Sequence, residues 1–291
     1  TLEGAQGNDT LDGGRGNDVI NGGPGVDTAV YDGPQSSHTI TISPSGTTVT
    51  DRRPDGAGTD TLTGIEFIDF DGISFDVNAF GGAAQITVEE LEDIIELYIA
   101  YFDRAPDAFG LNFWATNYAN GNVSTLDEMA RLFAPQEETI LNYPPGTNDA
   151  EFVTAIYNNV LGRDPDDEGF AFWTGVLGSG ARERDEFILE MLRGVDAPNA
   201  PGDSAELVAQ RAIDRDFLDT KTDIGAYYAV HLGLSDREEG RAVMDLYDGF
   251  AVTEIDARDQ ADAFFAAAQE PDSGAFLMPL VGVLTDSFDP S

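Results

Sequence analysis

Glycine and aspartate recur every nine residues near the start of the sequence, in a pattern that can bind a hard cation through oxygen atoms. The pattern runs without gaps through three copies, residues 4–12, 13–21 and 22–30. Glycine holds the first and fourth positions of each copy, and the sixth positions are Asp9, Asp18 and Asp27. Glycine allows a tight turn at unusual φ, so the turn carbonyls can face inward beside the carboxylate. Such an all-oxygen shell is the one that Ca²⁺ prefers.

We expect the first six positions of each copy to form the turn and to supply the calcium ligands. The expected residues of the regular copies are Gly4, Gln6, Gly7, Asp9, Gly13, Arg15, Gly16, Asp18, Gly22, Gly23, Gly25 and Asp27. Two copies make one coil of a β-roll, so copies two apart stack on the same side. Asp9 and Asp27 are therefore expected to share one ion. The alternative is a flexible Gly/Asn/Asp loop, against which the three in-phase copies argue.

A degenerate copy at residues 56–62 offers a partner for the middle turn. It keeps Gly56, Gly58 and Asp60 at matching offsets, with an apolar residue two positions after the aspartate. We expect Asp60 to complete a second calcium site with Asp18. An ordinary glycine-rich hairpin turn explains the same residues, so both interpretations stay open at this point.

These turns must be held by short strands. The apolar eighth positions, Leu11, Ile20 and Ala29, are expected to lie buried between two sheets. Alternating residues predict further strands at 39–43, 47–51, 66–70 and 73–77, which would cap the open end of the roll. The sequence therefore predicts a β-roll over 1–33 and a β-rich capping segment over 34–80. His38, at a strand start, is expected at the surface.

The apolar period becomes helical from Thr87, which begins a capping box with Glu90. We expect an all-α domain over 87–270, which makes the chain an α+β protein. Within it, residues 98–114 match 157–173 at an offset of 59, so two copies are expected at about 90–135 and 149–194. Further helices are predicted at 204–219, 224–232, 236–247 and 253–268, the third with a Ser235–Glu238 capping box.

A second metal candidate lies in the turn of the second helical copy. Asp164, Asp166 and Glu168 fall at positions 1, 3 and 5 of an EF-hand-like stretch. Position 12 is Gly175 rather than the glutamate that an EF-hand needs. The competing interpretation makes Asp166, like Asp107 in the first copy, a helix N-cap. The Phe and Trp residues of both copies are expected in the core, with an aromatic sugar-binding platform as the alternative.

The nonapeptide resembles the RTX, or hemolysin-type, calcium-binding repeat, and residues 27–77 resemble a segment that often follows such repeats. The pattern Arg-x-Pro-Asp-x-x-Gly-x-x-Phe-Trp, at 104–114 and 163–173, resembles a helical domain of unknown function found beside RTX repeats in secreted bacterial proteins. The helical region is also similar to the anchoring region of RTX-type surface-layer proteins. The resemblance implies Ca²⁺ as the cofactor, type I secretion, and a C-terminal secretion signal, here expected within 271–291.

The composition argues against several classes of binding partner and metal site. The formal net charge of −39 opposes binding to nucleic acid or anionic membranes and attracts divalent cations. No apolar run is long enough to span a membrane, and the absence of cysteine excludes disulfides and thiolate metal sites. We find no recognisable catalytic motif, and two histidines cannot build a familiar His-rich metal centre. The chain itself is therefore not expected to be an enzyme.

The sequence thus predicts a calcium-binding protein that is extracellular or at the cell surface, exported by type I secretion, and adhesive or surface-layer-like. Its expected partners are calcium and a surface glycan or another exoprotein. The alternative is the calcium-binding and secretion region of a larger secreted hydrolase, a protease or polysaccharide-degrading enzyme. Because the sequence begins inside a repeat, we expect it to be a fragment or a processed form. The residues upstream of Thr1 would separate the two hypotheses.

Overall fold

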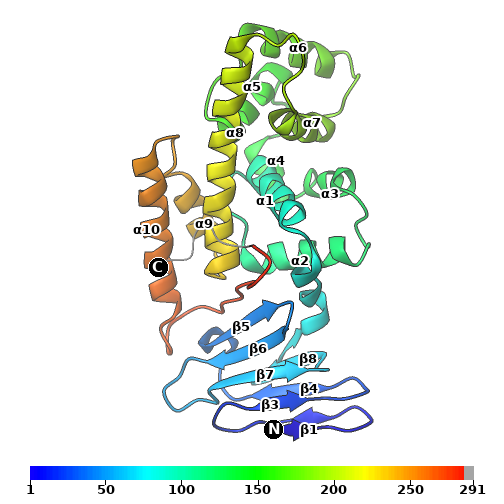
Figure 1. Cartoon of the computed structure of the whole chain (residues 1–291), viewed down its shortest axis with the longest axis vertical. Helices are drawn as coiled ribbons and strands as arrows, with labels where there is room; N and C mark the ends of the chain where they lie inside the picture. Colours follow the sequence, from blue (N-terminus) through cyan, green and yellow to red (C-terminus); the bar gives the residue numbers. More distant parts are fainter. Residues whose placement is uncertain (285–291) are drawn as a thin grey trace.

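The computed structural model describes residues 1–284 of the chain. Figure 1 shows the strands gathered at one end of the molecule and the helices stacked above them, with α8 and α10 side by side. Strands occupy the first part of the chain and helices most of the rest, so the predicted α+β fold class is confirmed. Within residues 1–284, no helix is long and apolar enough to cross a membrane.

The first four strands form a parallel roll in which two nonapeptides make one coil. They are β1 (Leu2–Glu3), β2 (Thr10–Leu11), β3 (Val19–Asn21) and β4 (Thr28–Tyr31). Leu2 pairs with Ile20, and Thr10 pairs with Thr28, so stacked strands are two copies apart. Ile20 and Ala29 are fully buried because their strands face each other across the roll.

The capping strands continue both sheets of the roll. They are β5 (His38–Ser43), β6 (Gly46–Asp51), β7 (Thr59–Thr63), β8 (Phe67–Phe70) and β9 (Ile73–Asp76). β7 pairs in parallel with β3, and β8 pairs in parallel with β4. The remaining pairings are antiparallel and give the orders β1-β3-β7-β6-β5 and β2-β4-β8-β9. The degenerate copy is therefore one more turn of the roll, and the antiparallel strands β5, β6 and β9 cap the two sheets.

The helical part repeats a three-helix unit. The first copy contains α1 (Val88–Phe102), α2 (Ala108–Ala119) and α3 (Leu126–Phe133), and the second contains α5 (Asp149–Leu161), α6 (Asp167–Gly178) and α7 (Arg184–Asp196). A short helix α4 (Glu137–Asn142) lies between the copies. Asp107 and Asp166 cap the second helix of each copy by accepting from the amides of Gly110 and Gly169. Both aspartates are thus N-caps, as the structural interpretation of the motif expected.

The shared Arg and Gly residues of the motif pack against a tyrosine. The Arg104 guanidinium lies 5.4 Å from the Tyr98 ring centre, and Arg163 lies 5.5 Å from the Tyr157 ring centre. A Cβ added at Gly110 would lie 2.4 Å from the Tyr98 hydroxyl, so the glycine is required for this contact. The motif is therefore explained by packing.

The aromatic pair that ends the motif divides between core and surface. Trp114 packs 5.1 Å from Phe133, and Trp173 packs 4.8 Å from Phe187, measured between ring centres. Phe113 and Phe172, in contrast, are 40% and 59% exposed. The prediction that these phenylalanines are core residues is wrong, because the packing of each second helix leaves both rings partly open to solvent, even though the Phe113 ring centre lies 6.4 Å from that of Phe80.

The last helices are α8 (Ala205–Ala226), α9 (Arg237–Met244) and α10 (Ala251–Ala268). The helices predicted at 204–219 and 224–232 are continuous, since α8 runs into a π-helical turn, η4 (Tyr227–His231). Asp236, not Ser235, caps α9 by accepting from the amides of Glu238 and Glu239. Ser235 instead accepts from the Phe109 amide, so the predicted Ser235–Glu238 capping box is wrong. The 3₁₀ helices are η1 (Gln35–Ser37), η2 (Val77–Ala79) and η3 (Gly81–Gln85).

His38 is fully buried, so the expectation of a surface histidine is wrong. Its ring centre lies 4.7 Å from that of Phe70 and 5.8 Å from that of Tyr31. Its Nδ1 lies 3.0 Å from the Pro34 carbonyl oxygen, and burial lowers its pKa. The sheet pairing buries this position because strand β5 turns it inward.

The chain after α10 returns to the capping sheet. Leu277 and Leu280 form parallel bridges with Thr39 and Ile42 on the edge strand β5. Leu277, Met278 and Leu280 are almost fully buried, and the Met278 amide donates to the Gly233 carbonyl after η4. This returning segment joins the strand-rich and helical parts. The expected secretion signal includes residues 285–291, which lie outside the described residues.

Candidate calcium-binding site

The roll places its turns along two edges. One edge, here called the Asp27 edge, contains the stacked turns 4–9, 22–27 and 64–66. The other, here called the Asp60 edge, contains the stacked turns 13–18 and 56–60. On the Asp27 edge, the Gly4 amide donates to the Asn21 carbonyl and the Gly7 amide to the Pro24 carbonyl. The Val26 amide donates to Asn8 Oδ1 at 3.1 Å. These bonds set the turns directly over one another.

Asp9 and Asp27 lie together between the first two turns of the Asp27 edge. The Asp9 amide donates to Asp27 Oδ1 at 2.7 Å. The second carboxylate oxygen of each residue is buried and has no hydrogen-bond partner among residues 1–284. A buried oxygen of this kind is costly unless a charge partner satisfies it. The structure thus brings Asp9 and Asp27 together, as the nonapeptide spacing requires, and their sharing of one ion stays a prediction.

The glycines leave open the space that these oxygens face. A Cβ added at Gly4 would lie 2.6 Å from the Gly22 carbonyl oxygen and 2.7 Å from Asp9 Oδ2. One added at Gly25 would lie 1.9 Å from the Gly7 carbonyl oxygen. Gly23 has φ +90, which favours glycine, and lies against the Ala5 carbonyl. Backbone and carboxylate oxygens therefore lie close to glycine α-carbons, where any side chain would displace them.

This donor set fits Ca²⁺. Within residues 1–284, no group of three or more Asp, Glu, His or Cys residues is arranged to hold a metal ion by side chains alone. An ion between the turns must therefore take several ligands from the backbone, as calcium does when it accepts six to eight oxygens. Asp9 and Asp27 would supply the carboxylates and the neighbouring glycine turns the carbonyls. Gln6 is exposed at the tip of its turn.

The Asp60 edge brings together Asp18 and Asp60. The Asp18 amide donates to Asp60 Oδ1 at 2.8 Å, and the Thr61 amide donates to the Asp18 carbonyl. The Gly16 amide donates to the Ala57 carbonyl, and Gly58 has φ +93. The structure thus supports the interpretation of 56–62 as a roll turn.

Gly56 belongs to a different contact. A Cβ added there would lie within 2.2–2.5 Å of the Asp51 carboxylate. The Gly56 amide donates to the Arg53 carbonyl, which closes the turn before the degenerate copy. The structure therefore places Gly56 beside Asp51 rather than beside Asp18 and Asp60.

The Asp60 carboxylate differs from Asp9 and Asp27 because its second oxygen is satisfied. The Tyr31 hydroxyl donates to Asp60 Oδ2 at 3.0 Å inside the roll. Burial raises the pKa of Asp60, and burial together with this carboxylate raises the pKa of Tyr31. On the Asp60 edge, the Tyr31 hydroxyl therefore satisfies the second carboxylate oxygen. On the Asp27 edge, the corresponding oxygens have no hydrogen-bond partner within residues 1–284.

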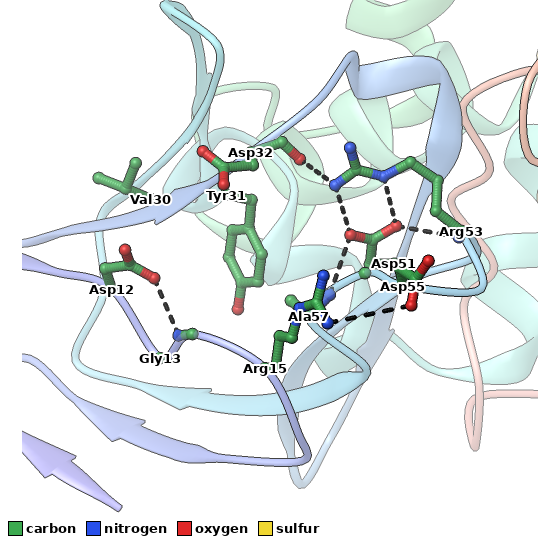
Figure 2. Close-up of a pocket in the computed structure, with 12 residues that line it drawn as sticks. Asp12, Gly13, Arg15, Val30, Tyr31, Asp32, Asp51, Arg53, Asp55 and Ala57 are labelled. Carbon is green, nitrogen blue, oxygen red and sulfur yellow. Dashed lines mark hydrogen bonds and ion pairs between the residues drawn. The ribbon is translucent and has the colours of Figure 1, made fainter.

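A polar pocket of about 380 Å³ opens beside Tyr31. Figure 2 shows Tyr31 between Asp12 on one side and the Asp51–Arg53 pair on the other. Burial alone would raise the pKa of Asp51, but its bonds to Arg53 lower the pKa to about 2. The Arg15 guanidinium lies 3.9 Å from Asp55, so its side chain lines this pocket.

The EF-hand-like acids do not come together in a metal cluster within the described chain. Asp166 is occupied as the N-cap of α6. Asp164 Oδ1 accepts from the Asn158 side chain at 2.9 Å. Glu168 lies exposed in the first turn of α6. The capping interpretation of this turn accounts for its aspartates.

Glu66 is a residue of the roll that sequence reasoning missed. Its Oε2 accepts from the Asp27 amide at 2.7 Å, which repeats the contact that Asp27 makes with Asp9. Glu66 precedes Phe67, the partner of Thr28 in the parallel ladder, as Asp27 precedes Thr28. Glu66 lies 39 residues after Asp27 in the sequence, which is not a multiple of nine. Only the strand pairing therefore reveals that Glu66 belongs to this edge.

Comparisons with known proteins agree with this geometry. A family model described as RTX calcium-binding nonapeptide repeat (4 copies) matches residues 1–29. A second model, described as domain of unknown function (DUF4214), matches residues 130–197, which include the second helical copy. No curated protein and no solved structure matches the chain. Such repeats are typical of secreted proteins and imply that this roll binds Ca²⁺.

Proposed function

Since the chain carries RTX calcium-binding nonapeptide repeats and a DUF4214 domain, we propose that it is a calcium-dependent extracellular protein. We propose that a type I system exports it and that it acts at a cell surface without catalysing a reaction. The observation that carries the proposal is the pair of buried carboxylate oxygens on Asp9 and Asp27, which have no protein partner within residues 1–284.

Calcium acts as a folding switch in this proposal. Where calcium is scarce, carboxylate repulsion in a chain of net charge −39 opposes closure of the roll. Outside the cell, ions bind only the stacked turns and therefore stabilise the folded state. Extracellular calcium modules bind with Kd of about 10⁻⁴–10⁻³ M. At a hundredfold excess over Kd, one site adds about 2.7 kcal/mol to the free energy of unfolding.

The returning C-terminal segment supports the same order of events. Its backbone bonds to β5 and to the residues after η4 can form only once both parts have folded. A secretion signal that includes this segment would be accessible in the unfolded chain and covered afterwards. Export before folding is therefore compatible with the structure of residues 275–284.

We expect calcium to raise the thermal unfolding midpoint of the full chain by about 5–10 °C per bound ion, from about 2.7 kcal/mol per site. Magnesium should raise it far less, because Mg²⁺ demands octahedral geometry and gives up water reluctantly. Differential scanning calorimetry in matched chloride salts, at equal ionic strength, measures both shifts. Equal shifts with the two ions would mean that calcium acts only by screening charge.

The helical part offers a pocket for the partner. A cavity of about 400 Å³ lies where α5, α8 and the end of α9 meet, a size in the range of small-molecule sites. Lys221, the only lysine of the chain, is buried there and donates to the carbonyl and Oδ1 of Asn159. Within the described chain, Lys221 makes these hydrogen bonds and no ion pair, and burial lowers its pKa to about 8.

We propose that this pocket takes a neutral sugar of a surface glycan. The Phe217 and Tyr247 rings, 5.0 Å apart, give it an aromatic wall. The carboxylates of Asp103 and Asp245 and the buried ammonium provide acceptors and a donor for hydroxyl groups. Because the pocket has more acids than cations, an anionic ligand is disfavoured.

A glycan array probed with the full chain in calcium should show binding to neutral glycans. Asp245→Ala, which removes an exposed pocket carboxylate, should reduce that binding at least tenfold. Asp216→Ala, an exposed change on α8 outside the pocket, is the matched control and should leave it unchanged. Binding to no neutral glycan, or equal loss in both variants, would contradict the pocket assignment and favour a protein partner.

The non-catalytic part of the proposal is supported by the environment of His38. This histidine is one of two in the chain, and it is fully buried between the rings of Tyr31 and Phe70, with its Nε2 3.6 Å from Asp51 Oδ2. Such a position suits packing rather than proton transfer to a substrate. A catalytic motif encoded upstream of Thr1 would favour the alternative, a region of a larger secreted hydrolase. Further repeats there would favour a surface protein.

A further inference from the structure

On the Asp27 edge, two successive pairs of stacked turns have the same hydrogen bonding. Each such pair is here called a rung. In the first rung, Asp27 Oδ1 accepts from the Asp9 amide at 2.7 Å. In the second rung, Glu66 Oε2 accepts from the Asp27 amide at the same distance. The Thr28 amide donates to the Asp9 carbonyl, and the Phe67 amide donates to the Asp27 carbonyl. Glu66 therefore stands where a third nonapeptide aspartate would stand.

The oxygens that face the open space also repeat. Around Gly4, the first rung brings together Asp9 Oδ2 and the Gly22 carbonyl oxygen. Around Gly22, the second rung brings together Asp27 Oδ2 and the Gly64 carbonyl oxygen, 2.6 Å and 2.0 Å from an added Cβ. Asp27 is fully buried, and its Oδ2 has no hydrogen-bond partner within residues 1–284. Like the first rung, the second rung therefore contains a buried carboxylate oxygen without a partner, which a bound cation would satisfy.

On the Asp60 edge, the Asp60 carboxylate has no unpaired oxygen. Asp60 Oδ2 accepts from the Tyr31 hydroxyl, and Asp60 Oδ1 accepts from the Asp18 amide. Both oxygens of the carboxylate are thus satisfied by the protein itself. A calcium ion bound there would have to displace the tyrosine hydroxyl from the interior of the roll.

We propose that the second calcium ion of the roll binds between turns 22–27 and 64–66, with Asp27 and Glu66 as its carboxylate residues. The Tyr31 hydroxyl takes the place of an ion at the Asp18–Asp60 rung. Both ions then lie on the Asp27 edge, one above the other, and Asp27 borders both. This inference rests on the proposed calcium-dependent function, and it places the second ion at Asp27 and Glu66 where the nonapeptide spacing suggested Asp18 and Asp60.

Isothermal titration calorimetry of the full chain with CaCl₂ tests the placement. The unchanged chain should bind two ions. Glu66→Gln, which keeps an oxygen for the Asp27 amide but removes the charge, should bind one. Asp60→Asn, which keeps partners for Asp18 and Tyr31, should still bind two.

The outcomes separate the two proposals. No binding by the unchanged chain would overturn the calcium-dependent function itself. Two ions in Glu66→Gln, or one ion in Asp60→Asn, would overturn only the placement at Glu66. Circular dichroism in saturating calcium checks the fold of both variants. If Glu66→Gln does not fold, the Asp60→Asn stoichiometry decides, since loss of an ion there contradicts the inference and retention of two supports it.

Discussion

Replacing Gly22 with alanine should abolish the calcium-induced rise in the thermal unfolding midpoint. The new Cβ would lie 2.0 Å from the Gly64 carbonyl oxygen and 2.6 Å from Asp27 Oδ2. Neither group can move away without separating stacked turns, because one is backbone and the other is fully buried. The Gly22 carbonyl also borders the first rung, so both rungs of the Asp27 edge are affected. The expected loss is about 5 kcal/mol at a hundredfold calcium excess, from two sites of about 2.7 kcal/mol each.

Gly13→Ala is the matched control, because Gly13 holds the same position in the neighbouring copy. A Cβ there would meet only side-chain atoms, the nearest being Asp60 Oδ2 at 3.1 Å. This variant should therefore keep most of the calcium response. Scanning calorimetry with and without calcium measures both variants. An undiminished response in Gly22→Ala would show that calcium does not bind at the Asp27 edge.

A second large effect is expected from Glu96 in helix α1. Its side chain is buried with 8% exposure, and the carboxyl group makes no hydrogen bond or ion pair within the described chain. Burial raises its pKa well above the ordinary value, and neighbouring carboxylates raise it further. These neighbours are Glu92 and Asp93 on α1, Asp196 at the end of α7 and Asp219 on α8.

Glu96→Gln should raise the unfolding midpoint at pH 7.5 by several degrees, since about 1 kcal/mol corresponds to roughly 2–4 °C in a domain of 150–250 residues. The folded-state pKa of Glu96 lies above its unfolded-state value, so folding takes up a proton between the two. This stability is present below the unfolded pKa and is lost as pH rises through the folded pKa. Asp93 behaves in the same way, since burial raises its pKa to about 6.

The wild-type midpoint should therefore fall between pH 5.5 and pH 7.5 by more than the midpoint of Glu96→Gln. Saturating calcium keeps the roll folded in both proteins, so the difference between them reports the helical region. Glu206→Gln, an exposed change on α8 away from this cluster of carboxylates, should leave the pH dependence unchanged. Parallel pH profiles for wild type and Glu96→Gln would show that Glu96 is ionised in the folded protein at both pH values.

The sequence by itself determined the repeating elements and their chemistry. A strict period of nine with glycine and aspartate leads to turns, short strands and an oxygen-rich site, because few other structures tolerate those residues at that spacing. It therefore predicted the contact of Asp9 with Asp27. The 59-residue offset likewise predicted matching helices, because its Asp caps and Arg–Tyr contacts are local.

The tertiary structure decided which distant groups meet those elements. Glu66 reaches Asp27 only because β8 pairs with β4, and Tyr31 reaches Asp60 only because β7 pairs with β3. The burial of His38 and the return of residues 275–284 to β5 depend equally on strand pairing. Local spacing encodes the turn conformation, whereas long-range pairing sets whether a carboxylate oxygen meets a hydroxyl group or an open space. For this reason the sequence predicted the calcium chemistry, and strand pairing is the basis on which we propose Glu66 rather than Asp60 for the second ion.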